Sequence, residues 1–225
     1  MTAAGLLLAG TAVCAQEGQP PAQPAAPVVD VAEILKTCFP CHGDGAVSRI
    51  PTRPTIAGQK ADYVARQLTA FKRSAREMDQ AASPAQSGRF DPIMSHMALT
   101  LDDDVIGAVA DAVSKLACKG DKDDKAPQAN PPAAPGITVH CVACHGENGI
   151  SRVPQVPNVA GQQRAYLRRQ LLLIRETAWG AKPRGNETWR SHPIMERQAA
   201  RLSIEDVDAL AQYYAALDCR GSQQP

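Results

Sequence analysis

Apolar residues recur at helical spacing in several separate segments of this chain. In the segment DVAEILKTC, Asp30 stands as an N-cap before a stripe of apolar positions that runs from Val31 to Cys38. The longer segments 61–77 and 164–179 place their apolar residues at the same spacing. No stretch alternates in the manner of a β-strand, and the intervening segments are rich in Gly and Pro. The pattern predicts an all-α fold.

Two further helices are predicted later in the chain, one in each half. The apolar positions of the first run from Val105 to Leu116, and those of the second run from Ile204 to Leu217. Ser203, followed three residues later by an aspartate, fits a capping box at the start of the second helix. Each half therefore ends in an amphipathic helix.

The two halves of the chain are an internal sequence repeat. At an offset of 103, residues 38–72 align with residues 141–175 without a gap, and beyond them the offset falls to 101. The second offset aligns DPIM, which ends at Met94, with HPIM, which ends at Met195. A period this long indicates duplication of a whole domain, because solenoid repeats are much shorter.

Composition divides the chain into five parts. A short apolar stretch followed by small residues predicts a signal peptide at 1–15, although a buried first helix is an alternative. A Pro/Ala-rich tether at 16–29 precedes a first domain at 30–119, and a charged, Pro-rich linker at 120–135 precedes a second domain at 136–221. An export signal predicts that the protein lies in an oxidising compartment.

Charge and aromatic content narrow the function classes. The chain holds 24 Lys and Arg against 23 Asp and Glu, so the net charge of +1 predicts no binding to nucleic acid or to a membrane surface. Aromatic residues make up only 4% of the chain, which leaves two small domains with thin cores. Such domains usually need a disulfide, a metal or a bound cofactor.

One short motif in each half has the residues needed to attach a prosthetic group. The sequence C-x-x-C-H occupies residues 38–42 and 141–145. Two thiols one helical turn apart can form thioethers to one heme, and the adjacent histidine can then bind the iron. A zinc site would need four ligands per domain, and a thioredoxin-like pair would need a βαβ context; neither is present in the sequence. The motifs predict two covalently bound heme c groups, attached at Cys38, Cys41, Cys141 and Cys144, with His42 and His145 on the irons.

Methionines at matching positions are the predicted sixth ligands. Met94 and Met195 each follow a Pro-Ile dipeptide and align in the repeat. The rival ligands are His96 and Met97 in the first half and His192 in the second. Thioether ligation raises the reduction potential relative to two histidines, and an iron with both axial positions filled moves electrons without binding substrate.

Other repeated residues are candidates to support the two hemes. A proximal histidine usually donates its second ring N–H to a carbonyl, and Pro54 and Pro157, twelve residues after the histidines, could hold that carbonyl in place. Ordinary surface or loop packing is the alternative for each polar candidate. The repeated polar residues that could donate to heme propionates are Arg49 and Arg152, Tyr63 and Tyr166, and Gln67 and Gln170.

The motif set resembles the diheme cytochrome c4 family over about residues 30–221. The segments PTIAGQKADYVARQL and PNVAGQQRAYLRRQL carry the resemblance, together with the two C-x-x-C-H motifs and the two methionines. The resemblance implies tandem class-I cytochrome c domains related by a pseudo-twofold axis, each wrapped around a covalent heme. It also implies a periplasmic electron carrier, not an enzyme, between a quinol-oxidising complex or dehydrogenase and a terminal oxidase. The chain departs from the pattern in its long charged linker, and Trp179 stands where the first half has Arg76.

Two questions stay open in the sequence. The protein could instead be the cytochrome subunit of a dehydrogenase, as in flavocytochromes, or a diheme peroxidase with one displaceable iron ligand. Cys118 and Cys219, which align at the offset of 101, could bridge the two domains across the pseudo-twofold axis or remain separate thiols. Sequence does not supply the distance that a disulfide demands.

Overall fold

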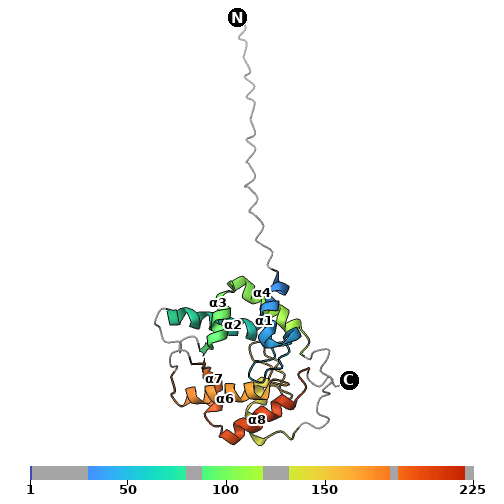
Figure 1. Cartoon of the computed structure of the whole chain (residues 1–225), viewed down its shortest axis with the longest axis vertical. Coiled ribbons are helices and arrows are strands. Elements are labelled where there is room, and N and C mark those ends of the chain that lie inside the picture. Colours follow the sequence, from blue (N-terminus) through green and yellow to red (C-terminus); the bar gives the residue numbers. More distant parts are fainter. Residues whose placement is uncertain (2–29, 80–87, 119–131, 183–186, 221–225) are drawn as a thin grey trace.

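The protein is almost entirely helical, as the sequence predicts. In the computed structural model (Figure 1), the α-helices and strands follow one order in both halves. The first half contains α1 (Val31–His42), the 3-10 turn η1 (Asp44–Ala46), α2 (Ala61–Asp79), β1 (Arg89–Phe90), α3 (Pro92–Leu99) and α4 (Asp103–Lys115). The second half contains the 3-10 helix η3 (Gly136–His140), α5 (Val142–His145), α6 (Arg164–Ala178), β2 (Trp189–Arg190), α7 (Pro193–Ala199) and α8 (Ile204–Ala216).

The structure describes residues 1, 30–79, 88–118, 132–182 and 187–220. The predicted signal peptide and tether lie outside these residues apart from Met1, as does most of the predicted linker. Within the described ranges, no helix combines the length and the apolar character needed to cross a bilayer.

Local capping explains where several helices begin. The carboxylate of Asp30 accepts hydrogen bonds from the backbone N–H groups of Ala32 and Glu33, which starts α1. At α8 the predicted capping box is confirmed: Ser203 Oγ accepts from Asp206 N at 3.0 Å, and Asp206 Oδ2 accepts from Ser203 N at 2.9 Å. Both α3 and α7 begin at a proline, whose missing N–H costs nothing in the first turn.

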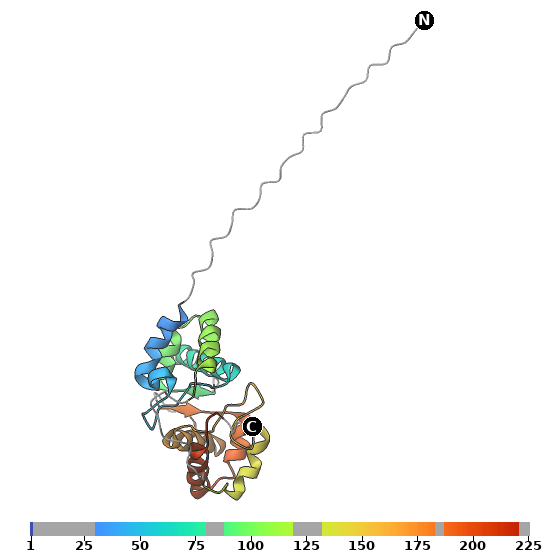
Figure 2. The same ribbon diagram turned by 90° about the vertical axis from the view of Figure 1, so that its right-hand side faces the viewer.

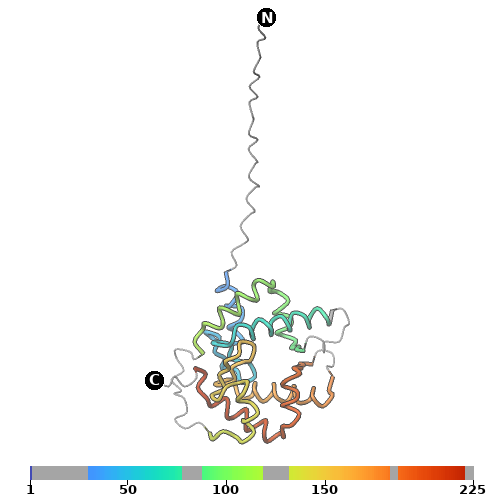
Figure 3. Tube along the Cα trace, turned by 180° about the vertical axis from the view of Figure 1, so that it is seen from behind, coloured from blue at the N-terminus to red at the C-terminus, as the bar shows by residue number. Residues whose placement is uncertain are grey.

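Each half has its own apolar core. In the first half α2 packs against α3 and α4, and in the second half α6 packs against α7 and α8. The buried cluster of the first half contains Leu35, Val64, Val105, Val109, Ala110 and Val113. The buried cluster of the second half contains Ile174, Ala199, Leu202, Val207, Leu210 and Tyr214. The two long helices, α2 and α6, therefore organise separate cores in separate lobes (Figure 3).

The two halves differ in the helix that carries the C-x-x-C-H motif. In the first half the motif lies at the end of one continuous helix, α1, which includes Pro40. In the second half the same region is divided into η3 and the four-residue helix α5. Both versions end at the histidine and are followed by a glycine with positive φ, Gly43 or Gly146. The position of the motif is thus preserved although the helix before it is not.

Two short strands were missed by the sequence pattern. Arg89 pairs with Arg190, and Phe90 pairs with Trp189, in an antiparallel ladder that joins the two halves. Figure 2 shows these strands between the two lobes. A strand of two residues has no alternation to detect, and its hydrogen-bond partner lies about a hundred residues away, so only the tertiary arrangement forms it.

Candidate functional site

The two histidines of the C-x-x-C-H motifs occupy matching environments. His42 is 6% exposed and His145 is 8% exposed. His42 Nδ1 lies 2.8 Å from the carbonyl oxygen of Pro54, and His145 Nδ1 lies 2.9 Å from that of Pro157. Because a carbonyl oxygen can only accept, Nδ1 carries the proton in each ring and Nε2 keeps its lone pair. Nε2 is therefore the atom available to a metal.

The surroundings of both rings favour this neutral form. Burial lowers the pKa of His42, and the nearby charge of Arg53 lowers it further, against the opposing effect of the hydrogen bond to Pro54. Burial also lowers the pKa of His145, with Arg190 acting in the same direction and the Pro157 carbonyl opposing. A neutral imidazole is the form that binds iron.

The four cysteines of the motifs are separate thiols. Cys38 packs against the core of the first half and Cys141 against that of the second, and burial raises the pKa of both thiols. Cys41 is half-buried and Cys144 is exposed. In each pair the first thiol therefore packs against the core, which suits attachment of a prosthetic group that lies against the core.

The predicted methionine ligands lie near the starts of two matching helices. In α3, Asp91 Oδ1 accepts from the backbone N–H of Met94 at 3.1 Å. In α7, His192 Nδ1 accepts from the backbone N–H of Met195 at 3.4 Å. Met94 and Met195 are both half-buried, and Met195 contacts the apolar core of the second half.

The rival ligands are placed differently. His192 uses Nδ1 to cap α7. His96 is exposed on α3, whereas Met97 is half-buried on the same helix as Met94. Among these candidate ligands, only the methionines that follow Pro-Ile occupy equivalent positions in the two halves.

The repeated tyrosines and glutamines come together at the junction of the halves. Tyr63 accepts a hydrogen bond from Arg190 Nη2 at 3.0 Å, and Tyr166 accepts one from Arg89 Nη2 at 2.9 Å. Each arginine also donates to a glutamine of its own half: Arg89 to Gln67, and Arg190 to Gln170. These six residues, which we name the crossed network, are Tyr63, Gln67, Arg89, Tyr166, Gln170 and Arg190. Arg49 and Arg152 lie exposed on loops, and the contacts described for the crossed network involve neither.

Sequence reasoning missed the two arginines of this network. Arg89 and Arg190 align at the offset of 101, three residues before the proline of the PIM motif in each half. That coincidence was the available signal, because R-x-x-P-I-M is present twice. Arg89 is only 9% exposed and Arg190 is half-buried, which is unusual burial for an arginine.

Positive charge at the junction changes the titration of its neighbours. Burial by itself would raise the pKa of Tyr63, but Arg190 and Arg89 lower it to about 8. For Arg89 burial acts to lower the pKa, yet the two tyrosines raise it overall, so the guanidinium remains charged. Two like charges thus meet in a partly buried place, which favours the approach of anionic groups.

A further buried donor lies beside these arginines. The indole N–H of Trp189, the residue before Arg190, is buried and has no hydrogen-bond partner among the described residues. A buried donor of this kind normally finds an acceptor. Four cysteine thiols, two histidines with Nε2 available, two guanidinium groups and one buried indole N–H together fit covalently attached hemes with acidic side chains. Within the described ranges no group of three His, Cys, Asp or Glu side chains is arranged to hold a metal ion.

Comparison with known proteins agrees with this chemistry. The cytochrome c family matches residues 121–218. A cytochrome c4 of Stutzerimonas stutzeri is 30% identical over 199 residues, which cover 81% of this chain and 85% of that protein. This chain belongs to the cytochrome c4 family. Like other members of this family, it is a diheme electron carrier, not an enzyme, with two covalently bound heme c groups.

Two further relatives of this cytochrome c4 family member are informative. The crystal structure of reduced recombinant cytochrome c4 from Pseudomonas stutzeri matches with a TM-score of 0.63 at 27% identity, covering 84% of this chain and 97% of that one. It supports the tandem class-I arrangement of the two lobes. A thiosulfate dehydrogenase electron acceptor of Stutzerimonas stutzeri (strain A1501) is 29% identical over 192 residues, which cover 79% of this chain and 77% of that protein.

Proposed function

We propose that this protein carries electrons in the periplasm between respiratory components, with a quinol-oxidising complex or a dehydrogenase as donor and a terminal oxidase as acceptor. The observation that carries the proposal is the twin histidine site. In both halves a buried ring is held through Nδ1 by a proline carbonyl, next to two free thiols. Two sites of one kind in one chain suit a carrier better than a catalyst.

Each half would hold its iron through one histidine and one methionine. In the first half these are His42 and Met94, and in the second they are His145 and Met195. When bound, each heme supplies a one-electron ferric/ferrous couple, and a thioether ligand favours the ferrous state. The proline carbonyls fix the rotation of the imidazole rings, and the cores that contact Cys38 and Cys141 keep water from one side of each site.

The crossed network would bind the acidic side chains of the two hemes. Its arginines are charged, partly buried donors in the two halves, and the neighbouring Trp189 N–H is a further buried donor. Its tyrosines and glutamines orient the guanidinium groups, since Tyr63 and Tyr166 each accept from an arginine of the other half. This assigns Tyr63, Tyr166, Gln67 and Gln170 to the support of the sites, and a role for Arg49 and Arg152 stays a prediction.

The cysteine chemistry supports an exported protein. Cys118 and Cys219 form a disulfide, and disulfides persist in oxidising compartments such as the periplasm. The N-terminal segment predicted as an export signal agrees with this location. Fractionation of cells, followed by N-terminal sequencing of the protein, tests both statements: recovery from the cytoplasm with residues 1–15 retained would refute them.

A second candidate is a dedicated electron acceptor of one dehydrogenase. It is favoured by the relative named as a thiosulfate dehydrogenase electron acceptor. Stopped-flow mixing of the oxidised protein with a reduced thiosulfate dehydrogenase and, separately, with a quinol-oxidising complex tests the two assignments. Fast reduction by the dehydrogenase alone favours the dedicated acceptor, and fast reduction by the quinol-oxidising complex favours the respiratory carrier.

The diheme peroxidase alternative has less support. Both halves offer a methionine at the same place on the same kind of helix, whereas a peroxidase needs one iron with a displaceable ligand. Rapid binding of cyanide or peroxide by the resting protein would favour the peroxidase, and slow or absent binding would favour the carrier.

A further inference from the structure

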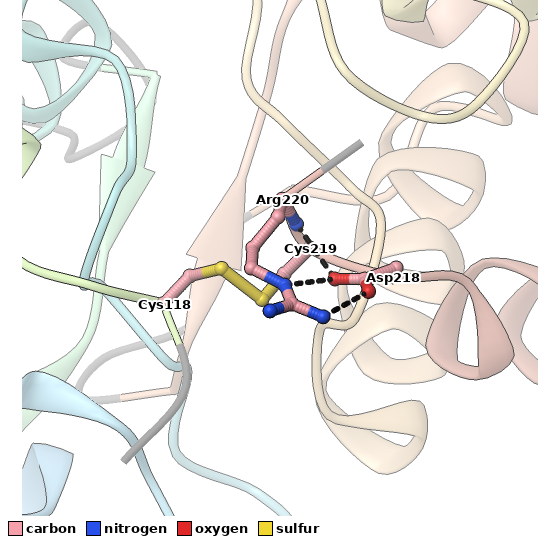
Figure 4. Close-up of polar contacts among 4 residues, drawn as sticks. All are labelled: Cys118, Asp218, Cys219 and Arg220. Atoms are coloured by element: carbon pink, nitrogen blue, oxygen red, sulfur yellow. Dashed lines mark hydrogen bonds and ion pairs between the residues drawn. A yellow bond between two sulfur atoms is a disulfide. The ribbon is translucent and has the colours of Figure 1, made fainter. Parts of the chain in front are cut away.

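The two halves are joined by a covalent bond between equivalent residues. Cys118 follows α4 and Cys219 follows α8, and they form a disulfide with a Cα–Cα distance of 6.1 Å (Figure 4). Their sequence separation of 101 equals the repeat offset, so the bond joins one residue to its own counterpart. Such a bond lies on the pseudo-twofold axis that relates the halves.

Two glycines make room for this disulfide. Gly58 and Gly161, from the paired AGQ triplets, have φ angles of +68° and +66°. A Cβ atom on Gly58 would lie 3.3 Å from Cys118 Cβ, and one on Gly161 would lie 2.6 Å from Cys219 Cβ. The repeated glycine of the motif therefore lets each loop approach the bridge closely.

The glutamines of the same triplets, Gln59 and Gln162, each pair with the backbone of the opposite half, and we name these two pairings the glutamine clasp. Gln59 donates through Nε2 to the carbonyl of Asn158 at 2.9 Å and accepts through Oε1 from Asn158 N at 2.9 Å. Gln162 makes the reciprocal pair with Thr55, donating at 2.8 Å and accepting at 2.9 Å. Each side-chain amide thus pairs with a backbone unit of the other domain, in the way that one strand pairs with another.

The disulfide and the clasp line one small cavity. Its volume is about 20 Å³, and its walls include both bridging cysteines and both clasping glutamines. A space of that size and polarity holds about one water molecule. The bridge and the amides therefore form one continuous attachment.

A second attachment uses other residues. Arg89 pairs with Arg190 in the ladder between β1 and β2, and Ser191 N donates to the carbonyl of Gly88 at 2.7 Å. The tyrosine–arginine contacts of the crossed network lie beside this ladder. Two attachments at different places fix the relative orientation of the halves more firmly than either would alone.

We propose that the Cys118–Cys219 disulfide is a positioning device for electron exchange between the two domains. It holds the junction covalently at one place, so that the crossed network at another place keeps the register in which each tyrosine meets the arginine of the opposite half. With both hemes bound, exchange would move one electron, so that the iron of one domain would be oxidised from ferrous to ferric as that of the other is reduced. Because the rate of such a step falls steeply with distance, a fixed junction gives one rate where a loose junction gives a distribution of slower ones. The inference rests on the proposed iron ligation in both domains.

The test compares the full protein carrying both hemes with the variant Cys118→Ser/Cys219→Ser. The far-red absorption band of ferric iron bound by methionine is measured first, for both irons. The rate of electron exchange between the domains after rapid one-electron reduction is measured next, together with the separation of the two midpoint potentials. Arg220→Ala is the matched control, because Arg220 neighbours Cys219 but pairs with Asp218 of its own segment (Figure 4).

The expected result is a several-fold slower exchange and a changed separation of potentials in the double variant, with both far-red bands retained and with Arg220→Ala like the wild type. Unchanged exchange and an unchanged separation would overturn the inference and leave the disulfide a merely structural bond. If the wild-type protein itself lacks one far-red band, the proposed ligation fails, and this inference fails with it.

A second measurement covers failure of the variant to fold. In the loaded wild-type protein a dithiol reduces the bridge by two electrons and becomes a cyclic disulfide, and the two new thiols are then alkylated. The reagents are then removed and both irons are reoxidised. An electron exchange between the domains that is slower than before the treatment supports the inference. An unchanged rate contradicts it.

Discussion

Tyr63 in the first domain accepts a hydrogen bond from Nη2 of Arg190 in the second domain at 3.0 Å. Tyr166 and Arg89 make the same contact in the opposite direction, at 2.9 Å. Each domain therefore completes the hydrogen bonding of a partly buried arginine that belongs to the other. The halves of this duplicated chain are interlocked, and neither carries a complete set of polar partners by itself.

Removing one phenol oxygen should weaken the junction. We expect Tyr63→Phe and Tyr166→Phe each to lower the free energy of unfolding by about 1.5–3 kcal/mol, because each leaves a charged, partly buried donor without that acceptor. Chemical denaturation of the loaded protein measures the change. The two variants are matched by the pseudo-symmetry, so a loss in neither would show that the crossed contacts do not hold the junction.

The glutamine clasp should contribute on both sides of the axis. Gln59→Ala and Gln162→Ala each remove a two-bond pairing and leave a backbone unit of the other domain, buried at Thr55 and half-buried at Asn158, without these partners. We expect each to cost about 1–3 kcal/mol. Gln212, which is exposed on α8, provides the control, and Gln212→Ala should change stability by less than about 0.5 kcal/mol. Equal effects of all three substitutions would argue against the clasp.

The repeated glycine beside the disulfide can be tested against a glycine in open space. Gly161 and Gly45 both have positive φ, but a Cβ on Gly161 would lie 2.6 Å from Cys219 Cβ, whereas one on Gly45 would meet nothing within 4 Å. We expect Gly45→Ala to cost about 1–2 kcal/mol for its backbone conformation alone. Gly161→Ala should cost clearly more and should reduce the yield of the disulfide, as free-thiol titration would show. Similar costs and full disulfide formation in both would contradict the close approach.

The iron ligands can be distinguished by spectroscopy. Met94→Ala and Met195→Ala should each remove half of the far-red band intensity of the ferric protein, because each domain would lose its thioether ligand. Met97→Leu is the matched control in the first domain, since Met97 lies one turn further along α3. Loss of the band in Met97→Leu, with retention in Met94→Ala, would reassign the ligand.

An ion pair between the exposed Asp103 and the buried Lys72 predicts a pH effect with a definite sign. Asp103 Oδ1 lies 2.7 Å from Lys72 Nζ, and the hydrogen bond and charge of Lys72 lower the pKa of this carboxyl below its ordinary value. The contribution is fully present above the ordinary aspartate value of about 3.9 and is lost as pH falls through the lower folded value. Asp103→Asn should therefore be less stable than the wild type at neutral pH, and the difference should shrink as acid unfolding is approached. A difference that is constant across pH would show that the pair does not titrate as described.

Helical periodicity and the repeat predicted most of this architecture. The segments 61–77 and 164–179 correspond to α2 (Ala61–Asp79) and α6 (Arg164–Ala178), and the capping box at Ser203 starts α8 as expected. These features are local, because a stripe of apolar residues or a helix cap depends on residues within about a dozen positions of one another. The C-x-x-C-H motifs were equally readable, since their chemistry lies in five consecutive residues.

The junction between the halves was harder to predict, for physical reasons. The ladder between Arg89 and Arg190 has two residues on each side, too few for an alternating pattern, and the crossed tyrosines meet residues more than seventy positions away. The Cys118–Cys219 pairing was left open because a bond depends on a distance that the sequence does not contain. Alignment of the two halves does indicate which residues are equivalent, because both arginines and both cysteines share the offset of 101.

The central claim is that each half of the chain carries its own covalently attached heme. Intact mass spectrometry with a pyridine hemochrome assay, applied to the exported protein and to Cys141→Ser/Cys144→Ser, tests it most directly. The account predicts two hemes per chain in the wild type and one in the variant, bound to the first domain. A wild-type protein with one heme or none, or a variant that still holds two, would contradict it.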